Sequence, residues 1–399
     1  MPFSDLPDHL SAPAIRNIHP VPVKQGETKM LALTDPYRLA AETVVVPPQV
    51  FQIVRLFDGE QSLEAITSST GAPPDKILSL VEKLDQVGLI WGPTADRLEA
   101  ETLARFHEAG AFPVRSSGSL GEDADACKAQ LDSWFDETED PELEHDATAI
   151  VAPHLDYDRG WPNYASAYFP WRGAEAPDRI VILGTNHFGH GDGVVMTDIA
   201  TESPLGRCEI DRQVVEAVAA ELGRGALVDQ IDHVPEHSIE LHIPWIQHCF
   251  GNVPIVAALI PSPLVEMLKD DGARVSTDDF VASLGNALAA AGGTTRFVAS
   301  ADLSHVGKQF GEPRPVDDQR RFDVERHDRE MMSKYIAGDA EEFVQAMRWN
   351  NNATQWCSIG NMAATMQLCQ PETIELVDYR QACDDQGQVM VSSCAMAMW

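Results

Sequence analysis

The histidines of the chain gather between residues 154 and 305, a stretch that holds eight of the thirteen. Short apolar runs rich in β-branched residues precede five polar side chains there: His154 after "TAIVAP", Asn186 and His187 after "RIVILGT", and Asp302 and His305 after "TRFVASA". In open α/β sheets, ligands bind beyond the carboxyl ends of the strands, so we expect these side chains at one edge of a sheet. No pair has zinc-finger spacing. The pattern therefore predicts a polar site and leaves open whether it holds a metal.

A second histidine-rich stretch, "PEHSIELHIPW" at residues 235–245, has two histidines and two glutamates within seven positions. A zinc-protease helix needs histidines at i and i+4, so that both imidazoles lie on one face. His237 and His242 are five apart, about 140° round a helix, and they do not converge. A helix start at Pro235, with Glu236 near the positive end of the helix dipole, explains this glutamate without a metal. The zinc-protease interpretation is therefore rejected.

The elements that must position the first site begin near residue 147. Apolar strand-like runs such as "RIVILGTNH" and "VPIVAALI" alternate there with helical segments such as "DRQVVEAVAAELG". This alternation predicts an α/β domain over residues 147–399, with a central, mostly parallel sheet flanked by helices. Residues 98–146 are interpreted as an acidic helical linker, because positions 122–146 hold eleven acidic residues and one basic residue.

The N-terminal third has a different pattern. Residues 1–30 contain several prolines and little periodicity, so an extended arm is expected. Residues 31–97 contain three segments whose apolar residues have helical spacing: "PPQVFQIVRLFDG", "SLEAIT" and "PPDKILSLVEKLDQVG". The short apolar run "LIW" follows them. Three helices and a short strand predict a small winged-helix-like module. Its third helix has no excess of Lys and Arg, so docking of a peptide or protein, or packing within the chain, is favoured over DNA binding.

Composition excludes several classes of protein. The formal net charge of −33 would repel a phosphate backbone, so neither nucleic acid nor an anionic membrane is expected as a partner. No run of eighteen apolar residues exists, and the first residues lack the basic and apolar segments of a signal peptide, so we expect a cytoplasmic protein. Seven cysteines without a CxxC pair fit reduced thiols better than a disulfide framework.

Six motifs in order make residues 147–399 resemble the Memo family, the B component of the AmmeMemoRadiSam system. They are "APHLDY", "ILGTNHFG", "SPLG", "EHSIELHIPW", "SADLSHVG" and "NNNATQWCSIGNM". The chain departs from the family at Leu155 and Asp156, where small residues are usual, and in "NHFGH", where paired histidines are usual. The module at 31–97 resembles PqqD-like and winged-helix domains, which bind leader peptides or protein partners.

The Memo fold is similar to that of class III extradiol dioxygenases, which hold Fe(II) with two histidines and a carboxylate. The resemblance implies that His154 and His187 are ligands and that Cys357 stands where the carboxylate would be. Asp302 and His305 are expected in the same pocket, His305 as an acid/base or supporting group. His237 is implied as a general base or oxygen-stabilising group. On residue type alone, Cys357 and the other cysteines fit buried small hydrophobes, and His190, His233, His242 and His248 fit surface or core positions.

Two imidazoles and a thiolate suit iron, with copper or zinc as alternatives. The first functional hypothesis is a mononuclear non-haem iron enzyme of oxygenase or oxidase type, acting on a small molecule or a peptide that the N-terminal module recruits. The second is a non-catalytic protein that binds or delivers iron or copper and docks a partner through that module. The third is a peptide- or ligand-binding cleft with no metal. A delivery protein could keep the same residues, so the sequence does not separate the first two.

Overall fold

The computed structural model describes residue 3 and residues 6–40, 42–121, 123–143, 147–189, 193–265 and 274–399. His190 and the end of the expected linker, residues 144–146, lie outside these ranges. The chain divides into two compact units, Met1–Ala109 and Gly110–Trp399. Within the described ranges, no helix combines the length and the apolar character needed to cross a membrane.

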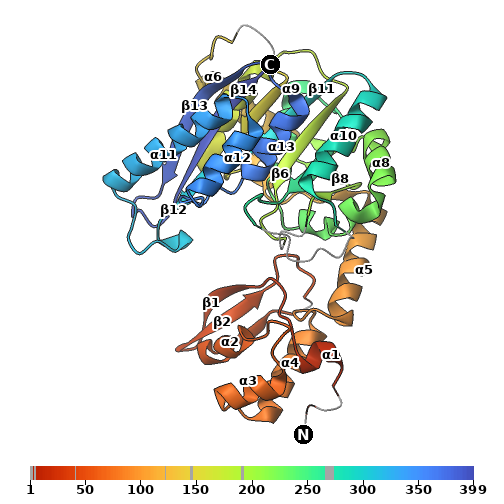
Figure 1. Ribbon diagram of the computed structural model, residues 1–399, viewed down its shortest axis with the longest axis vertical. Helices are drawn as coiled ribbons and strands as arrows, with labels where there is room; N and C mark the ends of the chain where they lie inside the picture. The colour runs from red at the N-terminus through yellow and green to blue at the C-terminus, as the bar shows by residue number, and fades with distance from the viewer. Residues whose placement is uncertain are drawn as a thin grey trace. The chain divides into compact units, whose positions relative to one another are not determined.

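The N-terminal unit contains a three-stranded antiparallel sheet in the order β1-β2-β3. Its elements, coloured red to orange in Figure 1, are α1 (Asp8–Ser11), β1 (His19–Gln25), β2 (Thr28–Thr34), β3 (Val44–Val46), α2 (Pro48–Val54), α3 (Leu63–Thr70), α4 (Pro74–Gln86) and α5 (Pro93–Ala109). Residues expected as an arm instead supply β1 and the start of β2. The two prolines of β1 are tolerated because β1 is an edge strand.

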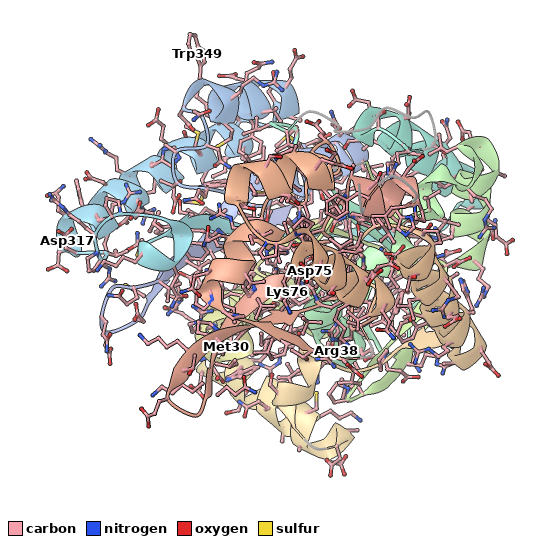
Figure 2. The ribbon with its side chains drawn as sticks, turned by 90° about the horizontal axis from the view of Figure 1, so that it is seen from below. Met30, Arg38, Asp75, Lys76, Asp317 and Trp349 are labelled. Carbon is pink, nitrogen blue, oxygen red and sulfur yellow. The ribbon has the colours of Figure 1, made fainter. Side chains whose placement is uncertain are left out.

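The three expected helices are present as α2, α3 and α4. Ser62 caps α3 by accepting a hydrogen bond from Ala65 N at 3.3 Å, and α4 begins at Pro74 and buries Ile77, Val81 and Leu84. Asp75 and Lys76 are exposed at the start of α4, so this surface carries mixed charge (Figure 2). The sheet precedes the helices, and "LIW" contributes only an isolated bridge between Ile15 and Ile90.

The boundary between the units differs from the expected one. α5 continues past residue 97 to Ala109, and residues from Gly110 onward belong to the larger unit. Within the expected linker, β4 (Ala111–Phe112) pairs with β8 (Ala200–Ser203), and α6 (Ala124–Glu137) buries Cys127, Leu131 and Phe135 in the main core. The apolar face of α6 therefore decides its place, whereas its acidic residues only cover the solvent side.

The larger unit is an α/β domain around an eight-stranded sheet in the order β12-β14-β5-β11-β6-β10-β7, with β13 paired to β14 (Figure 1). Its strands are β5 (Ala149–Ala152), β6 (Arg179–Thr185), β7 (Val195–Met196), β10 (Ile255–Ile260), β11 (Thr295–Ser300), β12 (Asp302–Val306), β13 (Ile374–Cys383) and β14 (Met390–Met398). The four central strands, β5, β11, β6 and β10, are parallel, and the outer pairs are antiparallel. The predicted fold class is confirmed.

Helices flank this sheet. They are α7 (Tyr157–Tyr168), α8 (Arg212–Glu221), α9 (Ile243–Phe250), α10 (Thr277–Ala291), α11 (Asp318–Ile336), α12 (Ala340–Trp349) and α13 (Ile359–Cys369), and a small second sheet joins β4, β8 and β9 (Gly206–Cys208). α13 packs on the parallel strands with α10 and α12 beside it, whereas α7 packs on β5, β13 and β14. Trp349 ends α12 and is 91% exposed, and it projects away from the body in Figure 2.

The register of the central strands brings their carboxyl ends to one level. Ala152 on β5 pairs with Ser300 on β11, and Leu183 on β6 pairs with Ala299 on β11. All these strand residues are buried, because helices cover both faces of the parallel sheet. The chain segments that follow β5, β6 and β11 therefore start from one edge of the sheet.

Candidate metal centre

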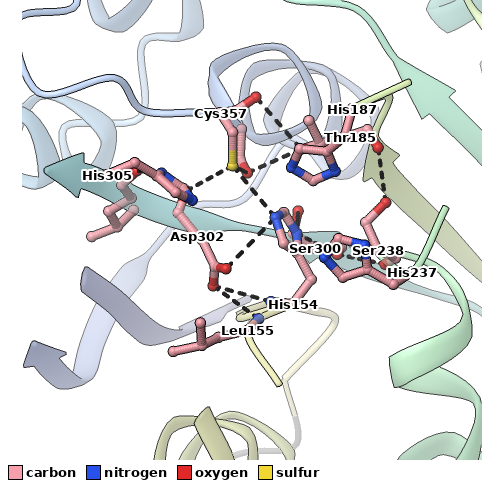
Figure 3. Close-up of polar contacts among 12 residues, drawn as sticks. His154, Leu155, Thr185, His187, His237, Ser238, Ser300, Asp302, His305 and Cys357 are labelled. Carbon is pink, nitrogen blue, oxygen red and sulfur yellow. Dashed lines mark hydrogen bonds and ion pairs between the residues drawn. The ribbon is translucent and has the colours of Figure 1, made fainter. Parts of the chain in front are cut away.

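Three rings and one thiol meet at that edge (Figure 3). His154 follows β5, His187 follows β6, His237 lies in the loop before α9, and Cys357 lies between α12 and α13. Ring centroids are 5.0 Å apart for His154 and His187, 5.6 Å for His154 and His237, and 5.1 Å for His187 and His237. Residues up to 203 positions apart in the sequence thus form one cluster.

His154 is held in one orientation. Its Nδ1 donates to the backbone oxygen of Ser300 at 3.1 Å, and Ser300 Oγ in turn donates to Ser238 O at 2.6 Å. This bond leaves Nε2 as the unprotonated nitrogen, and Nε2 lies 3.4 Å from Cys357 Sγ. His154 is only 1% exposed, and burial lowers its pKa well below the ordinary value. A neutral imidazole with a free Nε2 is the form that binds a metal.

His187 is oriented by the carboxylate of Glu236. The Nδ1 of His187 lies 3.1 Å from Glu236 Oε1, and the other carboxylate oxygen accepts the backbone N–H of His187 at 2.9 Å. Burial acts to lower the pKa of His187, but Glu236 and Cys357 outweigh it and raise that pKa well above the ordinary value. Metal binding through Nε2 would therefore displace a proton from His187 while Nδ1 keeps its bond to Glu236.

Cys357 is presented by a constrained loop. Asn351, Asn352 and Gln355 all have positive φ, at 55°, 46° and 59°, which is uncommon for residues other than glycine. Asn352 bonds back to both the amide nitrogen and the carbonyl oxygen of Trp356, at 2.7 and 2.9 Å. These contacts fix the backbone immediately before Cys357.

A chain of side-chain contacts runs behind the thiol. Ser358 Oγ lies 3.1 Å from Cys357 Sγ and 3.1 Å from Thr185 Oγ1, and Asn361 donates to Thr185 Oγ1 at 3.2 Å. The same Asn361 amide donates to Ser300 O, which also holds His154. Cys357 and His154 are therefore positioned by one connected network.

The ligand atoms of His154, His187 and Cys357 all lie within 4.8 Å of one another. Each imidazole has its other nitrogen engaged by an acceptor, which is the arrangement that supports metal-ligating histidines. The donor set therefore fits a transition metal that accepts imidazole and thiolate. His187, Glu236 and His237 form a second close group, but Glu236 already accepts the backbone N–H groups of His187, His237 and Ser238. That carboxylate supports the first group rather than forming another site.

The other expected site residues share the same pocket of about 380 Å³, lined by His154, His187, His237, Asp302 and His305 among others. Asp302 Oδ1 accepts the backbone N–H groups of His154 and Leu155 at 3.1 and 3.3 Å, and burial raises the pKa of Asp302 to about 7. Burial lowers the pKa of His237, and it lowers the pKa of His305 to about 4. The pocket therefore contains His187, with a raised pKa, neutral imidazoles of the other histidines, and a carboxyl group that titrates near neutral pH.

His305 has a defined tautomer. Its Nδ1 lies 3.0 Å from Leu303 O and 3.1 Å from Gln355 O, so that nitrogen carries the proton and Nε2 is the basic atom. The backbone N–H of His305 donates to Thr354 O at 2.8 Å, which ties β12 to the loop that presents Cys357. Asp302 thus begins β12, separated by one residue from the carboxyl end of the central strand β11, as expected, whereas His305 lies further along β12 at the edge of the sheet.

The stretch "PEHSIELHIPW" has a different structure from the one expected. Pro235 does not begin a helix: residues 235–239 are irregular, a 3₁₀ turn covers Glu240–His242, and α9 begins at Ile243. Glu236 and Glu240 are buried, so the helix-dipole explanation of Glu236 is wrong. Glu240 instead accepts the backbone N–H groups of residues 115, 116 and 117.

No pattern in the sequence assigns Glu236 or Ser300 to the site. The sequence feature that could have indicated a role for Glu236 is its position next to His237, an expected site residue. Gly184 is a related case, because a Cβ there would lie 2.5 Å from Ser238 Oγ, so a glycine lets β6 approach the 237–239 loop. His233 and His242 are buried, as expected for core positions, and burial lowers their pKa values to about 4 and about 3.

We expect Glu236→Gln to weaken metal binding about 10- to 100-fold, because His187 loses the charged acceptor that holds its ring. The measurement is a competition titration against a chromophoric chelator, with circular dichroism to verify folding. Glu202→Gln is the matched control, since Glu202 pairs with Arg207 in the β8–β9 hairpin and is not among the residues that line the pocket. Equal affinity in Glu236→Gln and wild type would show that Glu236 does not support a ligand.

Known proteins resemble this chain over the larger unit. A family model described as "Memo-like protein" matches residues 115–398. A MEMO1 family protein of Pyrobaculum aerophilum is 32% identical over 166 residues, 41% of this chain and 56% of that protein, and one of Methanothermobacter thermautotrophicus is 34% identical over 161 residues, 40% and 54%. A MEMO1 family protein of Aquifex aeolicus is 23% identical over 328 residues, which cover 80% of this chain and 82% of that protein.

In the Pyrobaculum and Methanothermobacter proteins, the chain spans about half of the relative's length. The matched residues 115–398 coincide with the larger unit and include all six expected site residues. Because this match covers more than half of the 399 residues, the chain belongs to the Memo-like protein family.

Proposed function

We propose that this protein is a metal-dependent redox enzyme of oxygenase or oxidase type, with a mononuclear non-haem iron held by His154, His187 and Cys357. The observation that carries the proposal is the convergence of these three ligand atoms, two of them from His154 and His187, which line a pocket together with His237, Asp302 and His305. Copper or zinc would suit the same donors. Three protein ligands leave coordination positions open, so a bound iron would supply redox chemistry and a place for a substrate.

The other pocket residues would move protons. His237 and His305 have pKa values lowered by burial, so both are neutral near pH 7 and each can accept a proton from a bound substrate. Asp302, with a pKa of about 7, can hold or release a proton in the same range. Glu236, Ser300 and Ser358 would keep the ligands in place without touching substrate.

We extend the proposal to the N-terminal unit, which would dock a peptide or protein partner in the cytoplasm. In the described part of that unit, β3 pairs with β2 on one side only, and β3 is rich in valine. An extended peptide can add to such an edge through backbone hydrogen bonds. β1, at the other edge, contains Pro20 and Pro22, which lack the N–H groups for such pairing. The test is Val45→Pro, which removes a backbone N–H group from β3. If this variant binds a peptide encoded by a neighbouring gene as tightly as wild type does, this placement is contradicted.

The test uses anaerobically purified, iron-loaded protein in an oxygen electrode, with the small-molecule fraction of host cells as the substrate source. We expect oxygen consumption that matches the loss of one compound measured by mass spectrometry. His237→Gln should retain iron and lose most of this activity, about 100-fold or more, because a general base is removed.

A delivery protein is the alternative. It would release iron or copper to a chelator within minutes and would consume no oxygen with any fraction. That pair of results would replace the enzyme proposal by the delivery function, since the same ligands serve both.

A further inference from the structure

The wall of the pocket carries an ion pair both of whose members line it, Asp156 and Arg159. Asp156 is the N-cap residue of α7, and Arg159 lies in the first turn of that helix. Arg159 Nε donates to Asp156 Oδ2 at 2.7 Å, and a second guanidinium nitrogen contacts the same oxygen. Both side chains are about half exposed, at 41% for Arg159 and 51% for Asp156. Among the described residues that line the pocket, Arg159 is the one lysine or arginine.

The guanidinium lines the same pocket as Asp302 and His305. A group bound to Arg159 therefore lies in one pocket with those side chains.

The rest of the wall is largely apolar. Leu155, Leu241, Phe310 and Val391 line the pocket, and the Phe310 ring contacts the His305 ring edge-on, with centroids 5.1 Å apart. A volume of about 380 Å³ lies in the usual range for small-molecule sites. Such a wall suits a ligand with an apolar body and few polar groups.

The charges decide which polar group fits. His187 is paired with Glu236, with Nδ1 and Oε1 3.1 Å apart. Asp302 Oδ1 accepts the backbone N–H groups of His154 and Leu155, and Asp156 is paired with Arg159. A divalent metal beside one thiolate would leave net positive charge, and this step rests on the proposed function. Arg159 adds a cation, whereas an ammonium ligand would meet repulsion from both. The planar guanidinium fork matches a carboxylate.

We propose that the pocket binds an amphipathic monocarboxylate. Its carboxylate lies on the guanidinium of Arg159, in the place now taken by Asp156, and its apolar body lies against Leu155, Phe310 and Val391. Asp156 competes with the ligand for the guanidinium, so it acts as an internal gate that tunes affinity. No bond is made or broken in this binding step.

Opposite effects of two substitutions test the proposal. Arg159→Gln should weaken binding of hexanoate about tenfold or more, since hydrogen bonds to a charged group are lost. Asp156→Asn should tighten hexanoate binding about two- to fivefold, because the Asp156 carboxylate no longer competes with hexanoate for Arg159. The affinity of Arg159→Lys for hexanoate should fall between those of wild type and Arg159→Gln. Arg326→Gln is the matched control, because Arg326 forms a similar exposed pair with Asp323 on α11.

The measurement is isothermal titration calorimetry of the full chain with hexanoate, its neutral isostere hexanamide, and hexylamine, in iron-loaded and metal-stripped protein. Hexanoate should bind best in both states, with the same order of variants. Hexanoate binding that is equal in wild type and Arg159→Gln, or hexanamide binding as tight as hexanoate, would overturn the proposal. If hexanoate binds only to iron-loaded protein and with the same affinity in wild type and Arg159→Gln, its carboxylate lies on the metal. That result would refute the carboxylate site at Arg159 and leave the proposed metal centre unaffected.

Discussion

Cys357→Ser protein purified without oxygen is expected to retain less than about a tenth of the metal bound by wild type. A serine hydroxyl is a much poorer ligand than a thiolate for metals that also accept imidazole. Changes in supporting residues alone typically cost 10- to 100-fold in affinity, so loss of a ligand should cost at least as much. His187→Ala should have a similar effect, because it removes both an imidazole and the partner of Glu236.

Elemental analysis by mass spectrometry measures this metal. Cys383→Ser is the matched control, since Cys383 lies on β13, is not among the residues that line the pocket, and its thiol donates to Asp384 O. Circular dichroism should show the same secondary structure in all variants. Undiminished metal in both Cys357→Ser and His187→Ala would refute the assignment of these two residues as ligands.

Asp328→Asn is expected to lower the free energy of unfolding by about 3 kcal/mol or more. Asp328 is fully buried on α11, and its carboxylate accepts four hydrogen bonds from side chains of four other segments. The donors are Ser304 Oγ at 2.5 Å, Trp356 Nε1 at 2.9 Å, Tyr379 OH at 2.8 Å and Ser392 Oγ at 2.6 Å. Asparagine offers one acceptor oxygen and turns a donor toward the others. Two lost bonds to a charged group account for the magnitude.

Urea denaturation followed by tryptophan fluorescence measures this loss. Asp323→Asn is the control on the same helix, since Asp323 is 40% exposed and its replacement should change stability by less than about 0.5 kcal/mol. Trp356 precedes Cys357 directly, so Asp328→Asn should also weaken metal binding. If Asp328→Asn and Asp323→Asn had the same free energy of unfolding, the four hydrogen bonds of Asp328 would make no net contribution to stability.

Much of the fold could be predicted from the sequence because the signals are local. β6 is a continuous apolar run, as strands buried on both faces are, and α4 has helical spacing with proline at its start. The strand at residues 19–25 is not predicted from the sequence, because prolines usually argue against a strand. They are tolerated here because β1 is an edge strand that pairs on one side with β2. The acidic composition of 122–146 hid the fact that α6 belongs to the α/β unit, since one buried face decides packing and eleven acidic residues do not.

The site was only partly predictable, for a similar reason. His154 and His187 could be placed together because parallel strands bring their carboxyl ends to one edge. Nothing in the pattern singled out Cys357, because a lone cysteine in a loop is usually a small buried residue, and only the family resemblance assigned it. Glu236 was assigned to a helix end that does not form. Its true role depends on a contact with a residue 49 positions away, which no local pattern contains.

The most direct test of the metal centre is X-ray absorption at the iron edge of reconstituted wild-type and Cys357→Ser protein. Wild type is predicted to show one sulfur neighbour at about 2.3 Å together with imidazole scattering, as for other metal thiolates. Cys357→Ser should lose the sulfur signal in whatever iron it retains. A wild-type spectrum with nitrogen and oxygen neighbours alone would contradict a centre built from His154, His187 and Cys357.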